Sequence, residues 1–359
     1  MRAYLLDHTG RYPKMQIPDV VKLLYQSEFG SGHMIADPGK SLERIRKEWN
    51  EVREMKNAGA DCTKKTSCVI EEIGDGMCRI SLDALGEGLR PETLNRIFVG
   101  TAGRKKGTTA GFEEKLKEFR ALCEGGELPF KTEAVDAYVT QYREEGYPAV
   151  SHSEEYRKSY HPAYRVADLY YARFYPVFLE IDRVLAKAGE NPVTVSIDGM
   201  CGSGKTTLGT VLAEVYGCNL FHMDDFFLRP EQRVPERLAE PGGNVDYERF
   251  QEEVLDHLKD PEGLSYRVYD CSVRRLTETV TVPYSRLNII EGAYSQNPYF
   301  HDPYDLHFFC SISEEEQMAR ILRRNGPEML KRFQEVWIPM ENRYFETFRL
   351  RDKNIVLDF

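Results

Sequence analysis

The chain has 359 residues, of which 41% are hydrophobic and 30% charged, and its formal net charge is −10. This composition is typical of a globular protein of about two domains and excludes a disordered chain. Nine of the ten excess negative charges lie from residue 193 onward, and residues 1–192 are nearly neutral. Neither part shows an evident basic face for duplex binding, so we expect no nucleic-acid partner.

The chain also lacks the sequence features of membrane and secreted proteins. No apolar run approaches the roughly 18 residues of a membrane helix, and the apolar stretch at the start is too short for a signal peptide. The eight cysteines are scattered without a Cys-x-x-Cys pair, which favours reduced structural thiols over disulfides or zinc. We therefore expect a cytoplasmic protein with no membrane partner, and the sequence leaves a homo-oligomer open.

Residues 1–190 are expected to form a mainly α domain of unknown role with a small β element. Helical patterns cover 17–29, 112–123, 134–142 and 164–188. Two apolar runs, 69–73 and 77–82, flank Gly74-Asp75-Gly76, which predicts a β-hairpin.

Two weaker signals lie in the same half. The segment Phe29-Gly30-Ser31-Gly32-His33 could approach an anion, and an ordinary loop is the alternative. His152 and His161 lack metal-ligand spacing to a carboxylate.

A domain boundary is predicted at Ala188–Pro192, where a helix-stopping glycine precedes Asn-Pro. From 193 to 359, strands and helices alternate. Strands are predicted at 193–197, 218–223, 287–290, 306–312 and 355–357, and helices at 206–216, 250–258 and 314–324. This order predicts an α/β domain with a mostly parallel sheet covered by helices.

The phosphate loop, Gly199–Thr206, matches the pattern G-x-x-x-x-G-K-[ST] and lies between a predicted strand and a predicted helix. In such a loop the backbone N–H groups surround phosphate oxygens, Lys205 neutralises phosphate charge and the Thr206 hydroxyl contacts Mg²⁺. The alternative is a glycine-rich turn with a surface lysine. We expect ATP and Mg²⁺ as cofactors, with ATP contacts from Gly199, Cys201, Gly202, Ser203, Gly204, Lys205, Thr206 and Thr207.

Further segments follow the phosphate loop in an order that resembles the uridine kinase family. They are Phe221–Phe227, Val268–Asp270, Thr279–Val282, Ile289–Gly292 and Arg320–Arg323. The resemblance covers about 193–359 and does not reach the N-terminal half. It implies a P-loop kinase that transfers the γ-phosphoryl of ATP to a hydroxyl of a small molecule, with a uridine-like nucleoside as the leading acceptor.

The resemblance also implies catalytic and metal-binding roles. Asp224 matches a catalytic aspartate that accepts the proton of the substrate hydroxyl and touches Mg²⁺. Asp225, the next residue, is the alternative for this role. Glu291 matches an acidic residue close to the metal, beside Thr206 and Asp224, and a solvated acid at a strand end is the alternative.

Four later positions are expected to bind the substrate, namely Asp246, Tyr269, Arg274 and Arg320, and Arg323 is expected to be catalytic beside Lys205 and Asp224. Asp246 matches an aspartate that binds sugar hydroxyls, or it caps a helix. Tyr269 matches an aromatic of the base pocket, or it is a core tyrosine. Arg320 and Arg323 match arginines directed at the sugar and at phosphate, with Arg324 and Arg332 as further candidates. Spacing of i, i+3 places the first two arginines on one helix face.

Two departures from the family pattern affect the expected acceptor. The histidine that usually follows Val-Tyr-Asp is replaced by Cys271–Arg275, and the arginine- and glycine-rich lid turn is abbreviated. Arg274 and Arg275 would suit an anionic acceptor. The alternatives are therefore a pantothenate-like or sugar-phosphate acceptor, or a nucleotide-responsive switch whose output is the N-terminal domain.

Overall fold

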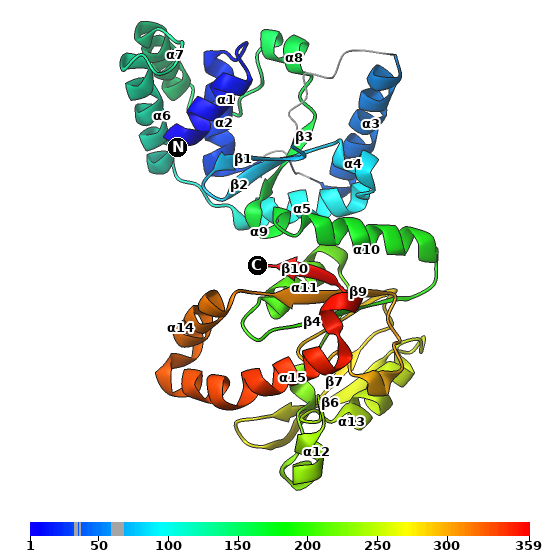
Figure 1. Ribbon diagram of the computed structural model, residues 1–359. Coiled ribbons are helices and arrows are strands. Elements are labelled where there is room, and N and C mark those ends of the chain that lie inside the picture. Colours follow the sequence, from blue (N-terminus) through cyan, green and yellow to red (C-terminus); the bar gives the residue numbers. More distant parts are fainter. Residues whose placement is uncertain (32–34, 36, 59–67) are drawn as a thin grey trace. The chain divides into compact units, whose positions relative to one another are not determined.

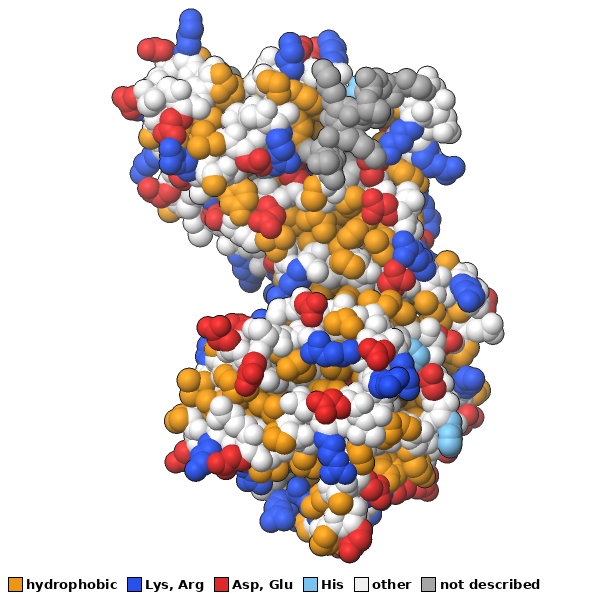
Figure 2. Space-filling model, viewed as in Figure 1, with side chains coloured by type: hydrophobic (Ala, Val, Ile, Leu, Met, Phe, Trp, Pro, Cys, Tyr) orange, Lys and Arg blue, Asp and Glu red, His pale blue; other side chains and the backbone are white. Residues whose placement is uncertain are grey.

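The computed structural model describes residues 1–31, 35, 37–58 and 68–359 and divides into two compact units, Met1–Arg183 and Val184–Phe359 (Figure 1). The division falls within α10 (Tyr175–Ala188), ahead of the loop where the sequence placed the boundary. In the described part of the chain, no helix is long and apolar enough to cross a membrane. On the face shown in Figure 2, acidic and basic side chains are interspersed.

The N-terminal unit consists mainly of helices around a three-stranded antiparallel sheet of order β1-β2-β3, as Figure 1 shows. The strands are β1 (Ile70–Gly74), β2 (Met77–Ser81) and β3 (Tyr164–Asp168). The helices are α1 (Arg2–Arg11), α2 (Ile17–Phe29), α3 (Pro38–Asn57), α4 (Ala84–Glu87), α5 (Pro91–Arg104), α6 (Thr109–Glu124), α7 (Thr132–Glu144), α8 (Glu154–Tyr160) and α9 (Leu169–Ala172), followed by α10. The predicted hairpin and the mainly α character are confirmed.

The single helix predicted over 164–188 is wrong. Its first part is strand β3, which pairs antiparallel with β2 from Ser81↔Tyr164 to Met77↔Asp168. Asp168 then caps α9 by accepting a hydrogen bond from the Tyr170 N–H at 2.8 Å. The pairing with β2 joins residues far apart in the chain, so the local aromatic and apolar pattern does not show it.

The C-terminal unit is built on a five-stranded parallel sheet of order β10-β9-β4-β8-β5. Its strands are β4 (Val193–Gly199), β5 (Asn219–His222), β8 (Leu287–Glu291), β9 (Leu306–Ser311) and β10 (Ile355–Asp358), and its helices include α11 (Lys205–Tyr216), α12 (Pro235–Ala239), α13 (Tyr247–Glu253), α14 (Glu314–Arg332), α15 (Ile338–Phe348) and α16 (Leu350–Lys353). Every residue of β4 and β8 is buried, as expected for strands covered on both faces. The predicted α/β fold is confirmed.

Two local features of this unit differ from the expectation. The helix predicted at 250–258 ends at Glu253 and continues as a 3₁₀ turn at Leu255–His257. A separate two-stranded antiparallel hairpin, β6 (Leu264–Asp270) and β7 (Arg275–Val282), lies outside the main sheet.

The cysteines agree with the expectation of thiols. No disulfide joins any of the seven cysteines that the structure describes, and Cys62 lies outside the described residues.

Candidate active site at the carboxyl ends of β4, β5 and β8

The phosphate loop joins the end of β4 to the start of α11. Gly199 has φ +134°, and a Cβ there would lie 2.2 Å from the Cys310 carbonyl oxygen, so the position excludes a side chain. Gly204, at the N-cap of α11, has φ +100°, which glycine adopts without strain. The loop therefore leads directly into the N-terminus of α11, where an anion can be bound.

The Lys205 ammonium is buried within the phosphate loop. Its Nζ donates to the carbonyl oxygens of Gly199 at 2.7 Å and Met200 at 2.9 Å. Burial by itself would lower the pKa of Lys205, but the carboxylates of Glu341 and Asp198 outweigh burial and raise it. Lys205 is thus held in its charged form at the loop.

The hydroxyl residues of the loop and of the start of α11 differ in their exposure. Ser203 is fully buried, and its Oγ has no hydrogen-bond partner among the described residues. An unpartnered buried hydroxyl in a phosphate loop fits an acceptor supplied by a phosphate. Thr206 and Thr207 are exposed.

Glu291 connects the phosphate loop to β5. It is 4% exposed at the end of β8, where Oε2 accepts from the Thr206 Oγ1 at 3.3 Å and Oε1 lies 2.5 Å from His222 Nδ1. The hydrogen bond to Glu291 raises the pKa of His222. The alternative of a solvated strand-end acid is therefore wrong.

Asp224 and Asp225 lie in a 3₁₀ turn, Met223–Phe226, that directly follows β5. Solvent reaches the Asp224 side chain, yet protein atoms surround most of it, and this desolvation, together with Glu291, raises its pKa against the opposing charge of Lys205. Desolvation also raises the pKa of Asp225, whose Oδ2 accepts from the Tyr266 hydroxyl at 3.5 Å. Both aspartates thus lie at this edge of the sheet.

Two buried acids that the sequence analysis missed hold the phosphate loop in place. Asp198 is fully buried and accepts from the Gly199 N–H at 2.7 Å, the Gln296 N–H at 3.1 Å and the Tyr344 hydroxyl at 2.9 Å. Glu341, from α15, accepts from the Cys201 N–H at 2.9 Å. The sequence could have pointed to Asp198, because it is a charged residue in an apolar strand. Nothing in the sequence pointed to Glu341, which lies far along the chain on α15.

Hydrogen bonds of its backbone to Gln317 and Glu341 fix the position of Cys201. Gln317 Nε2 donates to the Cys201 carbonyl oxygen at 2.9 Å. Burial, followed by the charge of Glu341, raises the pKa of the Cys201 thiol to about 12. The thiol is therefore protonated at neutral pH, and its sulfur accepts from Gln317 Nε2 at 3.3 Å.

Of the arginines on α14, Arg320 contacts the phosphate loop, where its Nη1 donates to the Gly202 carbonyl oxygen at 3.4 Å. Arg323 and Arg324 are both exposed, and the positive charge of Arg324 partly offsets the raised pKa values of Asp224 and Cys201. The phosphate-directed roles of Arg323 and Arg324 stay predictions. Arg332 lies over the Trp337 ring, with its guanidinium carbon 5.0 Å from the ring centroid.

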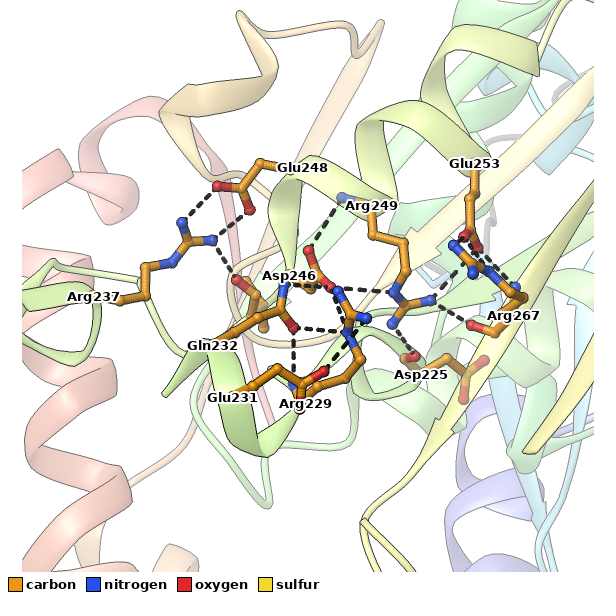
Figure 3. A network of polar contacts seen from close by, with 11 residues as sticks. Asp225, Arg229, Glu231, Gln232, Arg237, Asp246, Glu248, Arg249, Glu253 and Arg267 are labelled. Atoms are coloured by element: carbon orange, nitrogen blue, oxygen red, sulfur yellow. Dashed lines mark hydrogen bonds and ion pairs between the residues drawn. The ribbon is translucent and has the colours of Figure 1, made fainter. Parts of the chain in front are cut away.

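Asp246 lies in a network of polar contacts that Figure 3 shows from close by. It is 2% exposed, caps α13 by accepting from the Arg249 N–H at 3.3 Å, and accepts from Gln232 Nε2 at 3.0 Å and Arg249 Nε at 3.4 Å. The helix-cap alternative is confirmed. A role in binding sugar hydroxyls stays a prediction, and these protein donors already engage both carboxylate oxygens.

The β6–β7 hairpin brings other residues than predicted toward the aspartates. Tyr269 is 4% exposed, like a core tyrosine, whereas Tyr266 on the same strand reaches Asp225. Arg274 is exposed at the tip of the hairpin with φ +57°. Desolvation, with a smaller effect from the charge of Asp224, raises the pKa of Cys271 at the hairpin tip.

The oxygen donors of the site fit Mg²⁺. In the part of the chain that the structure describes, no group of three or more His, Cys, Asp or Glu side chains could hold a metal ion alone. Mg²⁺ at kinase sites is bound by one or two carboxylates together with substrate phosphates. The Thr206 hydroxyl and the carboxylates of Glu291 and Asp224 are such donors.

The comparisons with known proteins concern about half of the chain. No family model and no curated protein matches this chain. A solved structure described as a possible uridine kinase from Bacillus stearothermophilus is 23% identical, with a TM-score of 0.38, over 50% of this chain and 99% of that one. D-glycerate 3-kinase from Cryptococcus neoformans is 19% identical, with a TM-score of 0.33, over 42% of this chain and 78% of that one. Each of these two similarities thus covers about half of this chain or less.

Proposed function

We propose that the C-terminal unit is an ATP-dependent kinase that transfers the γ-phosphoryl group of ATP to a hydroxyl of a small molecule, with a ribonucleoside as the leading acceptor. One observation carries the proposal. The phosphate loop after β4, the aspartates after β5 and Glu291 at the end of β8 come together at one edge of a parallel sheet. Ligands of open α/β sheets bind at this edge.

Each of these groups has a role in phosphoryl transfer. Lys205, held charged in the loop, neutralises charge that develops on the phosphoryl oxygens. Asp224 accepts the proton of the attacking hydroxyl, and its raised pKa brings it closer to the working pH of a base. Mg²⁺, bound by Thr206, Asp224 and Glu291, would supply further charge neutralisation.

The acceptor would bind between the aspartates and the hairpin tip. Tyr266, beside Asp225, offers a hydroxyl and an aromatic face, and no histidine follows Tyr269 to read a base. A site that lacks one such contact discriminates less between substrates. We therefore propose ribose-dependent activity with little preference among bases. The rival is an anionic alcohol, for which the exposed Arg274 and Arg275, at the hairpin tip and the start of β7, are the supporting feature.

The experiment is a comparison of kcat/KM for ATP turnover with uridine, cytidine, adenosine, deoxyuridine, pantothenate and a sugar phosphate. Ribonucleosides are expected to be used best, with uridine only modestly ahead. Preference for pantothenate or a sugar phosphate, or indifference to the 2′-hydroxyl, would exclude the nucleoside while leaving the kinase. ATP binding without turnover on any acceptor would instead favour the nucleotide-responsive switch.

A further inference from the structure

The N-terminal unit contains a cavity of about 320 Å³ that lies among α2, α3, α8 and β3. Figure 1 shows these helices arranged around the strand. A neighbouring cavity of about 330 Å³ shares part of this wall, namely Lys22, Glu48, His152, Arg157 and Pro162. The two cavities therefore flank the same group of charged side chains.

The cavity wall carries a strong excess of positive charge. Among the described residues of the wall, four cationic side chains face the single carboxylate of Glu48, and they are Lys22, Arg44, Arg157 and Arg165. Glu48 is engaged by Arg165 at 2.7 Å, and Lys22 donates to the Val150 carbonyl oxygen at 2.7 Å. Within the described ranges, no acidic side chain pairs with Arg44 or Arg157, and both are exposed where solvent enters. An anion arriving from solvent would first meet these two guanidinium groups.

A buried hydroxyl at the same cavity has no partner. Ser31 lines the cavity, is 2% exposed, and its Oγ makes no hydrogen bond within the described part of the chain. Leaving a buried hydroxyl unpaired costs about 1–3 kcal/mol. Ser31 belongs to the segment that the sequence flagged as able to approach an anion, of which Gly32 and His33 lie outside the described residues.

Fixed hydrogen bonds hold the inner wall in shape. His152 bridges Asp19, 2.9 Å from its Nδ1, and the Tyr164 hydroxyl, 2.7 Å from its Nε2. Asp19 also accepts from the Ser153 hydroxyl at 2.6 Å and N–H at 2.9 Å. Asp19 is satisfied by these donors, although its charge still acts on Lys22. The site is thus preorganised.

We infer that this cavity binds the phosphate group of a small phosphate monoester. A dianion matches the three positive charges in excess, and guanidinium forks and a hydroxyl are donors suited to phosphate oxygens. Phe98, Pro162 and Val166 give the same cavity an apolar wall for the organic part of the ligand. The inference does not depend on the kinase proposal, because every residue it uses belongs to the N-terminal unit.

The test is the binding of inorganic phosphate to the full-length chain, measured by titration calorimetry. All variants carry Lys205→Ala, which weakens phosphate binding at the phosphate loop equally in each. Arg157→Met is expected to weaken phosphate binding at least about tenfold, as loss of a charge-assisted hydrogen bond does. Ser31→Ala is expected to weaken it several-fold. The matched control is Lys158→Met, which removes the neighbouring, exposed cation that pairs with Glu154.

Acetate is the second probe, and it is expected to bind much more weakly than phosphate because it is a monoanion. Circular dichroism and thermal unfolding of each variant check that the fold is retained. Three results would each overturn the inference: no saturable phosphate binding in the Lys205→Ala chain, equal affinity for acetate, or equal losses in Arg157→Met and Lys158→Met. Failure of the kinase proposal would show instead as absent ATP turnover with phosphate binding intact.

Discussion

Asp224 and Asp225 are adjacent in one 3₁₀ turn, and their different neighbours give them different roles. Asp224 is influenced by Glu291, Lys205 and Arg324, all groups of the phosphoryl-transfer site, whereas Asp225 contacts Tyr266. We expect Asp224→Asn to lower kcat by about 10²–10⁴-fold, as loss of a general base does, with little change in the KM for ATP. Asp225→Asn is the matched variant, and a larger loss there than at Asp224 would reverse the assignment. Steady-state kinetics with a ribonucleoside acceptor measures both.

The ion pair between His222 and Glu291 predicts a pH-dependent stability. The pKa of His222 is raised in the folded chain, so its stabilising effect is fully present below the ordinary histidine pKa of about 6.5 and is lost as pH rises through the raised value. His222→Gln should therefore lower the free energy of unfolding more under mildly acidic than under alkaline conditions. Urea unfolding at the two pH values measures this. His257→Gln, at an exposed histidine, is the control, and an equal loss at both pH values would contradict the prediction.

The charged ammonium of Lys22 lowers the stability of the folded chain. Burial, followed by the nearby Arg79 and Arg157, lowers its pKa to about 8, while Asp19 opposes this. The folded chain thus binds fewer protons than the unfolded chain between about pH 8 and pH 10.5, and stability rises across this range.

Replacing Lys22 is expected to increase the stability of the chain while weakening phosphate binding. Lys22→Met should raise the free energy of unfolding at neutral pH by about 2 kcal/mol, since a shift of this size is worth about 3 kcal/mol and the hydrogen bond to Val150 about 1 kcal/mol. The same variant should weaken phosphate binding. Urea unfolding and calorimetry measure the two effects, and a destabilised variant with unchanged phosphate binding would contradict the prediction.

At the scale of elements, α13 depends on the Asp246 cap. Asp246→Ala removes the cap, worth about 1 kcal/mol, and leaves the buried Arg249 without its closest carboxylate. Breaking a buried ion pair costs about 3–5 kcal/mol, and the carbonyl oxygen of Asp225, 2.8 Å from Arg249 Nη2, offsets part of this. We expect a total loss of about 3 kcal/mol in urea unfolding. Asp246→Asn keeps a hydrogen-bond acceptor at the cap, so its loss of stability should be smaller than that of Asp246→Ala but still measurable. Unchanged stability with lost acceptor binding would instead support a direct contact with a sugar.

The elements that sequence predicted correctly are those whose pattern is local. β4 and β8 are short apolar runs because both faces of a parallel strand are buried, and the phosphate loop needs glycine at positions of positive φ. β3 was missed because its pairing with β2 is long-range, and the β6–β7 hairpin because most of β7 is exposed and polar. Local pattern cannot report such contacts.

The site follows the same rule. Lys205, Thr206, Asp224 and Glu291 each end or follow a predicted strand, so topology alone brings them to one edge. Glu341 reaches the phosphate loop from α15, and only packing of the folded chain reveals it.

At the scale of the whole molecule, the two units have separate cores. Buried residues such as Leu23, Phe112 and Phe119 form one cluster, and Phe226, Phe250 and Phe309 belong to another. A compact unit with its own core can unfold on its own, and a chain of two such units departs from two-state behaviour. We therefore expect calorimetry of the full-length chain to show two unfolding transitions.

Ligands should then act on the two transitions separately, because a ligand stabilises only the unit that binds it. A non-hydrolysable ATP analogue with Mg²⁺ is expected to raise the transition of the C-terminal unit, and Lys205→Ala should remove this shift without moving the other transition. Inorganic phosphate in the Lys205→Ala chain should raise only the transition of the N-terminal unit, and Arg157→Met should reduce that effect. A single transition that shifts as a whole with either ligand would contradict independent units, and it would mean that each site stabilises the entire chain.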